Sequence, residues 1–313
     1  MPGANVESTI AAVERDTGIG KDTLRMWERR YGFPEPVRNP FGERTYPSVQ
    51  VAKLRVVKRL LDAGFRPGRI VPLPIDELMR LGGEGEASSK GRQAAGPTSQ
   101  FAQDALALLR ANDLAGLRRQ FELSQVHLGL SRFITELIAP LNTLIGDAWM
   151  RGEVEVFQEH AYTELVQRTL SHALFALSAS VSRAAPRVLL TTLRDEPHGL
   201  GLLMAEVVLS IEGAHCTSLG VQTPLPDIRR AAEALQPDVV AIGFTGCNGP
   251  NAVLNGVSEL RALLPPQVEL WAGGTVTALS RRNTVGVRVL PELADIHAEM
   301  QRWRAMRASM PAV

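Results

Sequence analysis

Hydrophobic residues in the middle third of the chain recur at intervals of three and four residues. One series runs from Ala105 to Leu123, and a second runs from Phe133 to Leu144. This spacing places the hydrophobic side chains on one face of a helix. Because the segment has room for about four helices, we expect a four-helix bundle over residues 101–184.

After Pro186 the pattern changes to short hydrophobic runs separated by helical patterns. The expected strands include residues 188–190, 216–221, 239–242, 268–272 and 287–290, and the expected helices cover residues 201–212, 227–235, 251–264 and 293–307. Alternating strands and helices build a parallel sheet, and right-handed crossovers then give a doubly wound α/β domain of the flavodoxin or Rossmann type. We place this domain at residues 185–313, with any ligand at the carboxyl ends of its strands.

The first hundred residues divide into a folded part and a linker. Residues 5–80 show short helical patterns with tight breaks, which predicts a small domain over residues 1–80. Residues 82–100 are rich in Gly, Ser, Ala and Gln and have no hydrophobic period. Such a segment buries too little surface to order itself, so we expect a flexible linker over residues 81–100. The chain is therefore predicted to be multidomain.

Composition excludes several classes of protein. With 45% hydrophobic and 21% charged residues the chain is ordinary for a globular protein. No stretch approaches the roughly 18 apolar residues that span a bilayer, and no secretory signal is visible at the start. The two cysteines, Cys216 and Cys247, support neither a disulfide framework nor a zinc finger. We expect a cytoplasmic protein without a membrane partner.

The net charge of +1 conceals an uneven distribution. Residues 20–69 contain 12 Lys and Arg against 5 Asp and Glu, whereas the rest of the chain contains 22 and 28. A basic segment on a mildly acidic body suits an anionic partner such as nucleic acid. A basic solvated surface explains the charge equally well, so charge alone leaves both interpretations open.

Residues 9–46 have the pattern of a helix-turn-helix followed by a wing. Asp22 is placed to cap a helix from Thr23 to about Tyr31, after a compact Thr-Gly-Ile-Gly turn. A stretch punctuated by Pro and Gly around Gly42 follows as the predicted wing. Guanidinium groups suit guanine edges and phosphates. The candidate DNA-contacting residues are Arg25, Arg29, Arg30, Tyr31, Arg38, Asn39, Arg44 and Tyr46.

Three aromatic or aliphatic residues in this segment have an alternative role in the core. Leu24 is expected to be buried, and core packing is also open for Trp27 and Tyr46. The string TGI-x-x-x-TLR-x-WERRYG-FP, followed by R-x-x-x-x-x-R-x-Y, resembles the winged helix of MerR-type transcription regulators over residues 7–75. The resemblance implies a regulator that binds double-stranded promoter DNA.

The long dimerisation helix that usually follows this module in MerR proteins is not expected here. Pro67, Pro72 and Pro74 interrupt the chain, and no sustained heptad pattern follows. Any oligomerisation must therefore come from elsewhere. Because a single winged helix makes few phosphate contacts and binds weakly, assembly of several copies would raise the affinity for DNA.

A histidine stands in the loop after the first expected strand of the α/β domain. The loop reads R-D-E-P-H-G-L-G over residues 194–201. Gly199 and Gly201 carry no side chains that would block a flat ligand. The carboxylate of Glu196 can bond one imidazole nitrogen of His198 and raise its basicity as a metal ligand. The same loop could instead cradle a phosphate at a helix N-terminus.

The pattern Glu196-x-His198-x-x-Gly201 resembles the D-x-H-x-x-G motif of cobalamin-binding domains, with Glu in place of the usual Asp. In that family a Ser-x-Leu-type element and a Gly-Gly pair follow later strands. The resemblance implies that His198 is the lower axial ligand of the cobalt and that the displaced nucleotide tail passes the residues at the matching points here, Thr245, Gly273 and Gly274.

The segment W-M-R-G-E-V-E-V-F-Q-E-H in the helical region places nine residues between Trp149 and Glu159. This W-x9-E-H spacing resembles the cobalamin cap of the CarH/LitR branch of MerR regulators. It implies that Trp149 covers the upper axial group and that Glu159 and His160 line the adenosyl pocket. The alternative is that Trp149 anchors the core and that Glu159 and His160 begin a helix.

One position departs from that branch. Its members place a histidine directly after the tryptophan, where it captures cobalt once light has expelled the adenosyl group, whereas this chain has Met150. A thioether is a softer and weaker ligand than imidazole. Water, His160 or another group could therefore take the upper position after illumination.

Together the modules resemble the light-sensing repressors of the CarH/LitR type. The resemblance implies a repressor that binds 5′-deoxyadenosylcobalamin in the dark, forms a homotetramer on promoter DNA in competition with RNA polymerase, and dissociates after photolysis. A cobalamin-independent or light-insensitive cobalamin-sensing regulator is one alternative. A methyltransferase or mutase module is another, but the sequence has neither a substrate-activating domain nor a convincing catalytic triad. We therefore expect no enzyme activity.

Overall fold

The computed structural model describes residues 7–39, 42–62, 65–78, 97–178, 186–245, 250–274, 279 and 284–309. The chain divides into two compact units. The first comprises residues 1–100 and 144–159, and the second comprises residues 101–143 and 160–313. None of the described helices is both long and apolar enough to cross a membrane.

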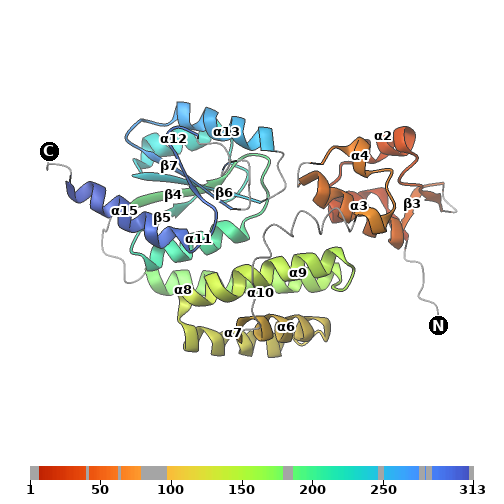
Figure 1. Cartoon of the computed structure of the whole chain (residues 1–313), viewed down its shortest axis with the longest axis horizontal. Coiled ribbons are helices and arrows are strands. Elements are labelled where there is room, and N and C mark those ends of the chain that lie inside the picture. Colours follow the sequence, from red (N-terminus) through yellow and green to blue (C-terminus); the bar gives the residue numbers. More distant parts are fainter. Residues whose placement is uncertain are drawn as a thin grey trace. The chain divides into compact units, whose positions relative to one another are not determined.

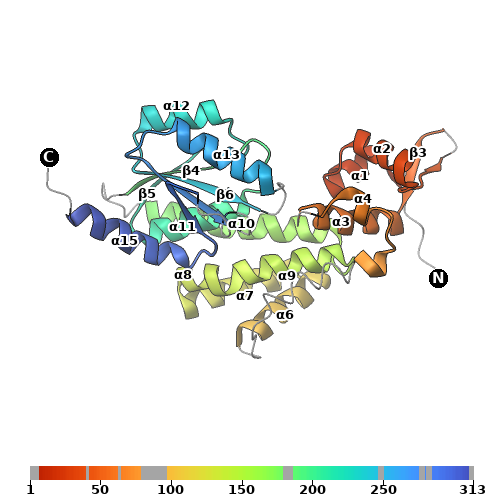
Figure 2. The same cartoon turned by 45° about the horizontal axis from the view of Figure 1, so that its top comes forward.

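The first unit contains a small helical domain with a three-stranded sheet (Figures 1 and 2). Its elements are β1 (Glu7–Thr9), α1 (Ile10–Thr17), α2 (Lys21–Tyr31), β2 (Val37–Arg38), β3 (Arg44–Pro47), α3 (Ser48–Asp62) and α4 (Pro67–Ile70). The antiparallel strands lie in the order β1-β3-β2. Leu24, Trp27 and Leu54 share one buried core beneath these helices. The predicted helix-turn-helix and wing are confirmed.

The start of α2 differs from the prediction. The helix begins at Lys21 after Gly20, which makes no side-chain cap, and Asp22 lies in its first turn. The carboxylate of Glu14 in α1 accepts the main-chain N–H of Lys21 at 3.1 Å. The prediction that Asp22 caps the helix is therefore wrong, because a side chain from the preceding helix already satisfies a free donor at this end.

The helical region begins with α6 (Pro97–Arg110) and α7 (Leu114–Leu128). One continuous helical stretch follows, made of α8 (Leu130–Arg132), η1 (Phe133–Ile138) and α9 (Ala139–Met150), and the region ends with α10 (Val156–Ser178). The predicted helices of the bundle are thus present. In the second unit the ring of Phe121 meets Phe133 edge-on at 5.7 Å and Tyr162 edge-on at 6.4 Å. These aromatic contacts tie α7, η1 and α10 together.

Only one end of the predicted linker can be compared with the structure. Most of residues 81–100 lie outside the described residues, but residues 97–100 belong to α6. The linker prediction is therefore wrong at that end. Pro97 explains the difference, because proline has no N–H and suits the first turn of a helix. The composition of the segment had suggested only that it lacks a hydrophobic period.

The α/β domain has a parallel sheet of β4 (Arg187–Thr192), β5 (His215–Ser218), β6 (Val239–Phe244), β7 (Glu269–Gly274) and β8 (Val287–Leu290) in the order β5-β4-β6-β7-β8. Figures 1 and 2 show α12 (Leu225–Leu235) and α13 (Pro250–Leu263) on one face and α11 (Leu200–Ile211) and α15 (Asp295–Ser309) on the other. The doubly wound prediction is confirmed.

Two details of this domain correct or limit the sequence analysis. β5 ends at Ser218 and not at residue 221, because Gly220 has a φ of 76° and turns the chain away. Burial raises the pKa of the half-buried Cys216 thiol to about 12, whereas Cys247 lies outside the described residues.

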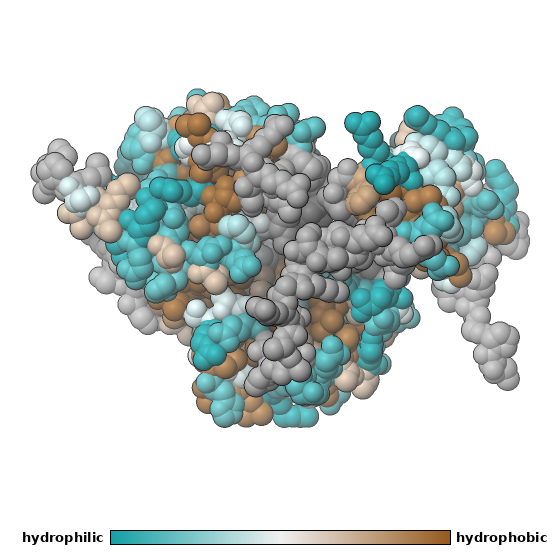
Figure 3. All heavy atoms as spheres, viewed as in Figure 1, coloured by the Kyte–Doolittle hydropathy of each residue, from teal (hydrophilic) through white to brown (hydrophobic). Residues whose placement is uncertain are grey.

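In the space-filling view, hydrophilic residues cover much of the described surface of this domain, with smaller hydrophobic areas between them (Figure 3).

Candidate functional site

The topology of the α/β sheet creates one natural ligand site. From β4 the chain crosses to β5 on one side and then returns to β6 on the other, so the order of strands reverses between β4 and β6. Ligands of doubly wound domains bind outside the carboxyl ends of the strands at such a point. The loop with His198 follows β4, and Thr245 follows β6.

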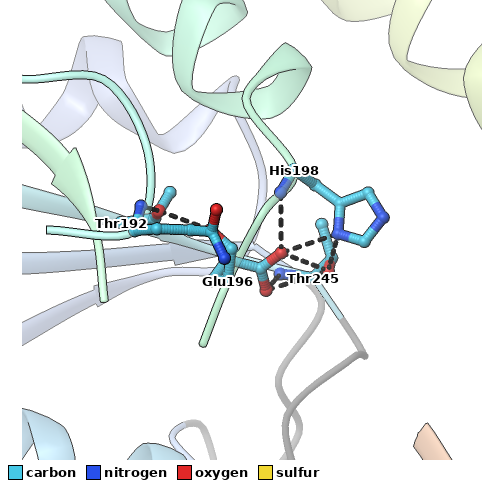
Figure 4. A network of polar contacts seen from close by, with 5 residues as sticks. Thr192, Glu196, His198 and Thr245 are labelled. Atoms are coloured by element: carbon cyan, nitrogen blue, oxygen red, sulfur yellow. Dashed lines mark hydrogen bonds and ion pairs between the residues drawn. The ribbon is translucent and has the colours of Figure 1, made fainter. Parts of the chain in front are cut away.

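Three of the predicted site residues meet here in one hydrogen-bond network (Figure 4). Oε1 of Glu196 lies 2.7 Å from Nδ1 of His198. The main-chain N–H of Thr245 donates to Oε2 of Glu196 at 2.8 Å, and its hydroxyl lies 2.9 Å from both carboxylate oxygens. The side chain of Glu196 is 0% exposed and that of His198 is 53% exposed. A buried carboxylate therefore holds an accessible imidazole.

The ionisation of Glu196 is set by two opposing effects. Burial by itself raises the pKa of this carboxyl group, but the hydrogen bonds from His198 and Thr245 outweigh burial and bring the pKa below its usual value. The charged carboxylate favours a proton on Nδ1 of His198, which leaves the lone pair on Nε2. In Figure 4 the far side of the ring points away from Glu196. Metal-ligating histidines commonly bond a carboxylate through one ring nitrogen in this way.

The loop itself is held by a residue that sequence reasoning missed. The hydroxyl of Thr192, at the end of β4, donates to the carbonyl oxygen of Glu196 at 2.6 Å and accepts the main-chain N–H of Gln222 at 2.8 Å. Thr192 is 1% exposed. A polar pair, Thr191-Thr192, at the end of a hydrophobic run was the available signal for a role in positioning.

A cavity of about 670 Å³ lies beside this network within the second unit. His198, Gly201 and Thr245 contribute to its lining, as do Gly273 and Gly274. The lining extends inward to three buried residues, Leu190, Leu209 and Trp271. A largely apolar cavity of this size with a few convergent polar groups is typical of a cofactor site. The structure thus gathers all the predicted residues of the α/β domain, with Glu196 behind the lining.

The glycine pair at the end of β7 has a packing reason of its own. Gly274 has a φ of 114°, and a Cβ atom there would lie 1.9 Å from the carbonyl oxygen of Phe244. A Cβ atom on Gly273 would lie 3.3 Å from the carbonyl oxygen of Leu290. The strand end therefore tolerates no side chain at residue 274, whether or not a ligand passes it.

Gly274→Ala is accordingly expected to lower the free energy of unfolding by about 2–4 kcal/mol, because main chain must move to admit the methyl group. Gly201→Ala is the matched control. It lies in α11, and a Cβ atom there meets nothing within 4 Å. This variant should be as stable as the parent or more stable by up to ~1 kcal/mol. Urea unfolding of the two variants checks the contrast, and equal stabilities would contradict it.

The three predicted residues of the cap are not among the residues that line this cavity. Trp149 is half-buried at the end of α9, and the guanidinium of Arg55 lies 5.2 Å from its ring centre within the first unit. Its indole Nε1 is buried and has no hydrogen-bond partner among the described residues. Glu159 is half-buried and His160 is exposed in the first turns of α10. Their roles around an upper ligand stay predictions, and the side chain of Met150 lies outside the description.

The exposed surface of α2 carries the predicted DNA-contacting arginines. Arg25, Arg29 and Arg30 are exposed on this helix. Arg25 pairs with Asp22 at 3.3 Å, and Arg30 lies 5.4 Å from the ring centre of the half-buried Tyr31. The arginines leave their charge accessible to solvent. This helix face is the candidate reading surface.

The wing contains one exposed cation and two residues with internal roles. The exposed Arg38 donates to the carbonyl oxygen of Gly42 at 2.8 Å and closes the turn of the hairpin. Asn39 accepts the main-chain N–H of Glu43 at 2.9 Å. The half-buried Arg44 pairs with Glu28 of α2 at 3.3 Å. Arg38 therefore remains the best-placed wing residue for a phosphate, while Asn39 and Arg44 also shape the wing.

The predicted contact between Tyr46 and DNA is wrong in this structure. Tyr46 is 0% exposed, and its hydroxyl oxygen is buried with no hydrogen-bond partner in the described part of the chain. Burial, with Glu28 nearby, raises the pKa of its hydroxyl. Tyr46 of β3 and Trp27 of α2 both belong to the core of this domain, where they are buried in one cluster with Val51 and Leu54 of α3. The alternative of core packing is the one observed.

Comparisons with known proteins agree with the two kinds of site. Residues 8–73 match the family of MerR HTH family regulatory proteins, and residues 103–174 match the family described as B12 binding domain. The chain is 31% identical over 259 residues to the HTH-type transcriptional repressor CarH of Myxococcus xanthus, and the alignment covers 82% of this chain and 85% of CarH. It is 28% identical over 265 residues to the repressor CarA of the same organism, and that alignment covers 82% of this chain and 83% of CarA.

A solved structure shares the fold of about two thirds of this chain. The monomethylamine corrinoid protein of Methanosarcina barkeri superposes with a TM-score of 0.51 at 13% identity, over 66% of this chain and 99% of that chain. At this identity the likeness shows a common fold and nothing more.

Proposed function

Because the chain belongs to the family of MerR-type transcriptional regulators with a cobalamin-binding domain, to which the CarH and CarA repressors belong, we propose that it is a light-responsive repressor with 5′-deoxyadenosylcobalamin as its chromophore. In the dark it assembles as a tetramer on double-stranded promoter DNA and competes there with RNA polymerase. The observation that carries the proposal is the Glu196–His198 pair beside the cavity of about 670 Å³.

The residues of the α/β domain fit cobalamin in two respects. Glu196 holds His198 through Nδ1, and the other ring nitrogen, Nε2, would hold the cobalt. The cavity behind His198 extends to Leu190 and Trp271, which provides apolar room for the nucleotide tail. Thr245 and Gly273 line it at the ends of the neighbouring strands β6 and β7. These residues bind and orient the cofactor and perform no catalysis, so we propose a regulator and no enzyme.

We propose that the residues of the cap mediate the response to light. When bound, adenosylcobalamin supplies a cobalt–carbon bond that light cleaves. By the resemblance to the CarH/LitR branch, Trp149 would cover the upper ligand, and Glu159 and His160 would line the adenosyl pocket. Met150 is a weaker ligand than histidine, so this chain relies on water, His160 or another group after illumination.

Each module of the chain has its own proposed role. Residues 1–80 bind DNA, the helices α6 to α10 form the cap, and residues 185–313 hold the cofactor. The arginines of α2 enter the major groove and Arg38 contacts the backbone. The cofactor stabilises the assembled state because it binds that state more tightly.

The test compares the absorption spectrum and the size-exclusion elution of the full chain with adenosylcobalamin, in the dark and after green light. We expect a bound spectrum and a larger particle in the dark, and a change in both after illumination. Bound cofactor without a light-driven change of size would favour a cobalamin sensor, an alternative that Met150 keeps open. A full-size oligomer without any cobalamin would contradict the proposal and favour a cobalamin-independent regulator.

A further inference from the structure

The helical side of the cavity presents few polar groups. Five lining residues come from η1 and α9, namely Thr135, Ala139, Pro140, Asn142 and Thr143. The hydroxyl of Thr135 donates to the carbonyl oxygen of Ser131 at 3.1 Å, and that of Thr143 donates to the carbonyl oxygen of Ala139 at 3.5 Å. Both threonine hydroxyls therefore bond to the main chain of their own helical stretch, and Asn142 differs from them.

The amide of Asn142 is held at one end by a buried tyrosine. The hydroxyl of Tyr162 in α10 donates to Oδ1 of Asn142 at 2.5 Å. Tyr162 is 2% exposed, and its ring meets Phe121 edge-on at 6.4 Å. The tyrosine is thus fixed in the bundle core, and its hydroxyl occupies Oδ1 of the amide.

The other end of the amide has only a weak partner. Among the described residues, the acceptor within hydrogen-bond distance of Nδ2 of Asn142 is the thioether sulfur of Met204, at 3.6 Å. Met204 also lines the cavity. A thioether is a poor acceptor on a flexible side chain, and an amide nitrogen has two protons to donate. An oxygen atom of a ligand in the cavity can replace the sulfur with a net gain.

We propose that Asn142 is a specificity-determining residue that donates from Nδ2 to a neutral oxygen acceptor of the bound cobalamin. The inference rests on the proposed function and adds a residue that the motif does not contain. Cobalamin offers such oxygens on the amide side chains of its corrin ring, and the adenosyl group offers them on its ribose. The shared chemistry is an uncharged oxygen acceptor on the helical side of the cavity.

The test measures dissociation constants in the dark by absorbance titration for adenosylcobalamin and methylcobalamin. Asn142→Asp keeps the size of the side chain and the acceptor for Tyr162 but removes both donors. We expect it to weaken binding by about 3- to 10-fold or more, the effect of one lost hydrogen bond. Asn255→Asp is the matched control, because it makes the same chemical change at an exposed residue of α13 that does not line the cavity. Its affinity should stay within about twofold of the parent.

Two further readouts separate recognition from a structural role. Tyr162→Phe frees the amide to rotate and should cause a smaller loss of affinity than Asn142→Asp. The melting temperature of the cofactor-free Asn142→Asp variant should match that of the parent, because the variant keeps the hydrogen bond from Tyr162. A loss of affinity that follows a lowered melting temperature in every variant would overturn the assignment.

The cofactor panel also locates the acceptor. An equal loss for adenosylcobalamin and methylcobalamin places the acceptor on the part that both share, the corrin with its amide side chains and nucleotide tail, whereas a loss confined to adenosylcobalamin places it on the ribose of the adenosyl group. Parent-like affinity of Asn142→Asp for both cobalamins would overturn the inference and leave the proposed function intact. Failure of the parent chain to bind any cobalamin would overturn both.

Discussion

Replacing His198 with alanine is expected to weaken cobalamin binding by about 100-fold or more and to change the spectrum of any cobalamin that remains bound. The side chain is accessible at the cavity, and Glu196 fixes its ring at 2.7 Å. Loss of a residue that only orients a metal ligand typically costs 10–100-fold in affinity, and loss of the ligand itself should cost at least as much. An absorbance titration with adenosylcobalamin in the dark measures both effects.

Two variants make this test specific. Glu196→Gln keeps the shape of the carboxylate but removes its charge, and it should weaken binding by about 10-fold or more because the imidazole is oriented less firmly. His297→Ala is the matched control, because this exposed histidine pairs with Glu212 at 2.8 Å and does not line the cavity. An unchanged spectrum and affinity in His198→Ala would remove its axial role.

The double substitution Arg29→Ala and Arg30→Ala is expected to weaken DNA binding by about 100-fold or more. Both side chains are exposed on α2, and a good arginine contact with a base or phosphate is worth about 1–3 kcal/mol. Fluorescence anisotropy measures the effect with a fragment that the parent protein selects from a random DNA pool, at a fixed salt concentration. If the arginines contact phosphates, the salt dependence of binding should also become less steep.

The control for this experiment removes two positive charges elsewhere. Arg118 and Arg168 are exposed arginines of the helical region and pair with Glu122 and Glu164 along their own helices. The double alanine variant at these positions lowers the net charge by the same amount and should bind DNA as the parent does. Equal binding by both double variants would mean that α2 is not the reading helix.

Much of the fold could be predicted because its signals are local. The recurrence of hydrophobic residues from Phe133 to Leu144 requires only the period of a helix, and the short runs after Pro186 require only the length of a strand. The Glu196–His198 pair could be predicted as well, because two residues in one tight loop stay close however the rest of the chain folds. The sequence by itself thus determined the order of the elements, the architecture and the central pair of the site.

Other features depend on residues far apart in the chain. Tyr46 faces the core because α1 and α3 close over β3, and no local spacing distinguishes this orientation from an exposed one. The hydroxyl of Thr192 accepts the main-chain N–H of Gln222, thirty positions away, and the amide of Asn142 contacts Tyr162 and Met204 of other elements. Only the tertiary structure decided these contacts, because a side chain's partner and burial depend on long-range packing, whereas its helix or strand period depends on its neighbours in sequence.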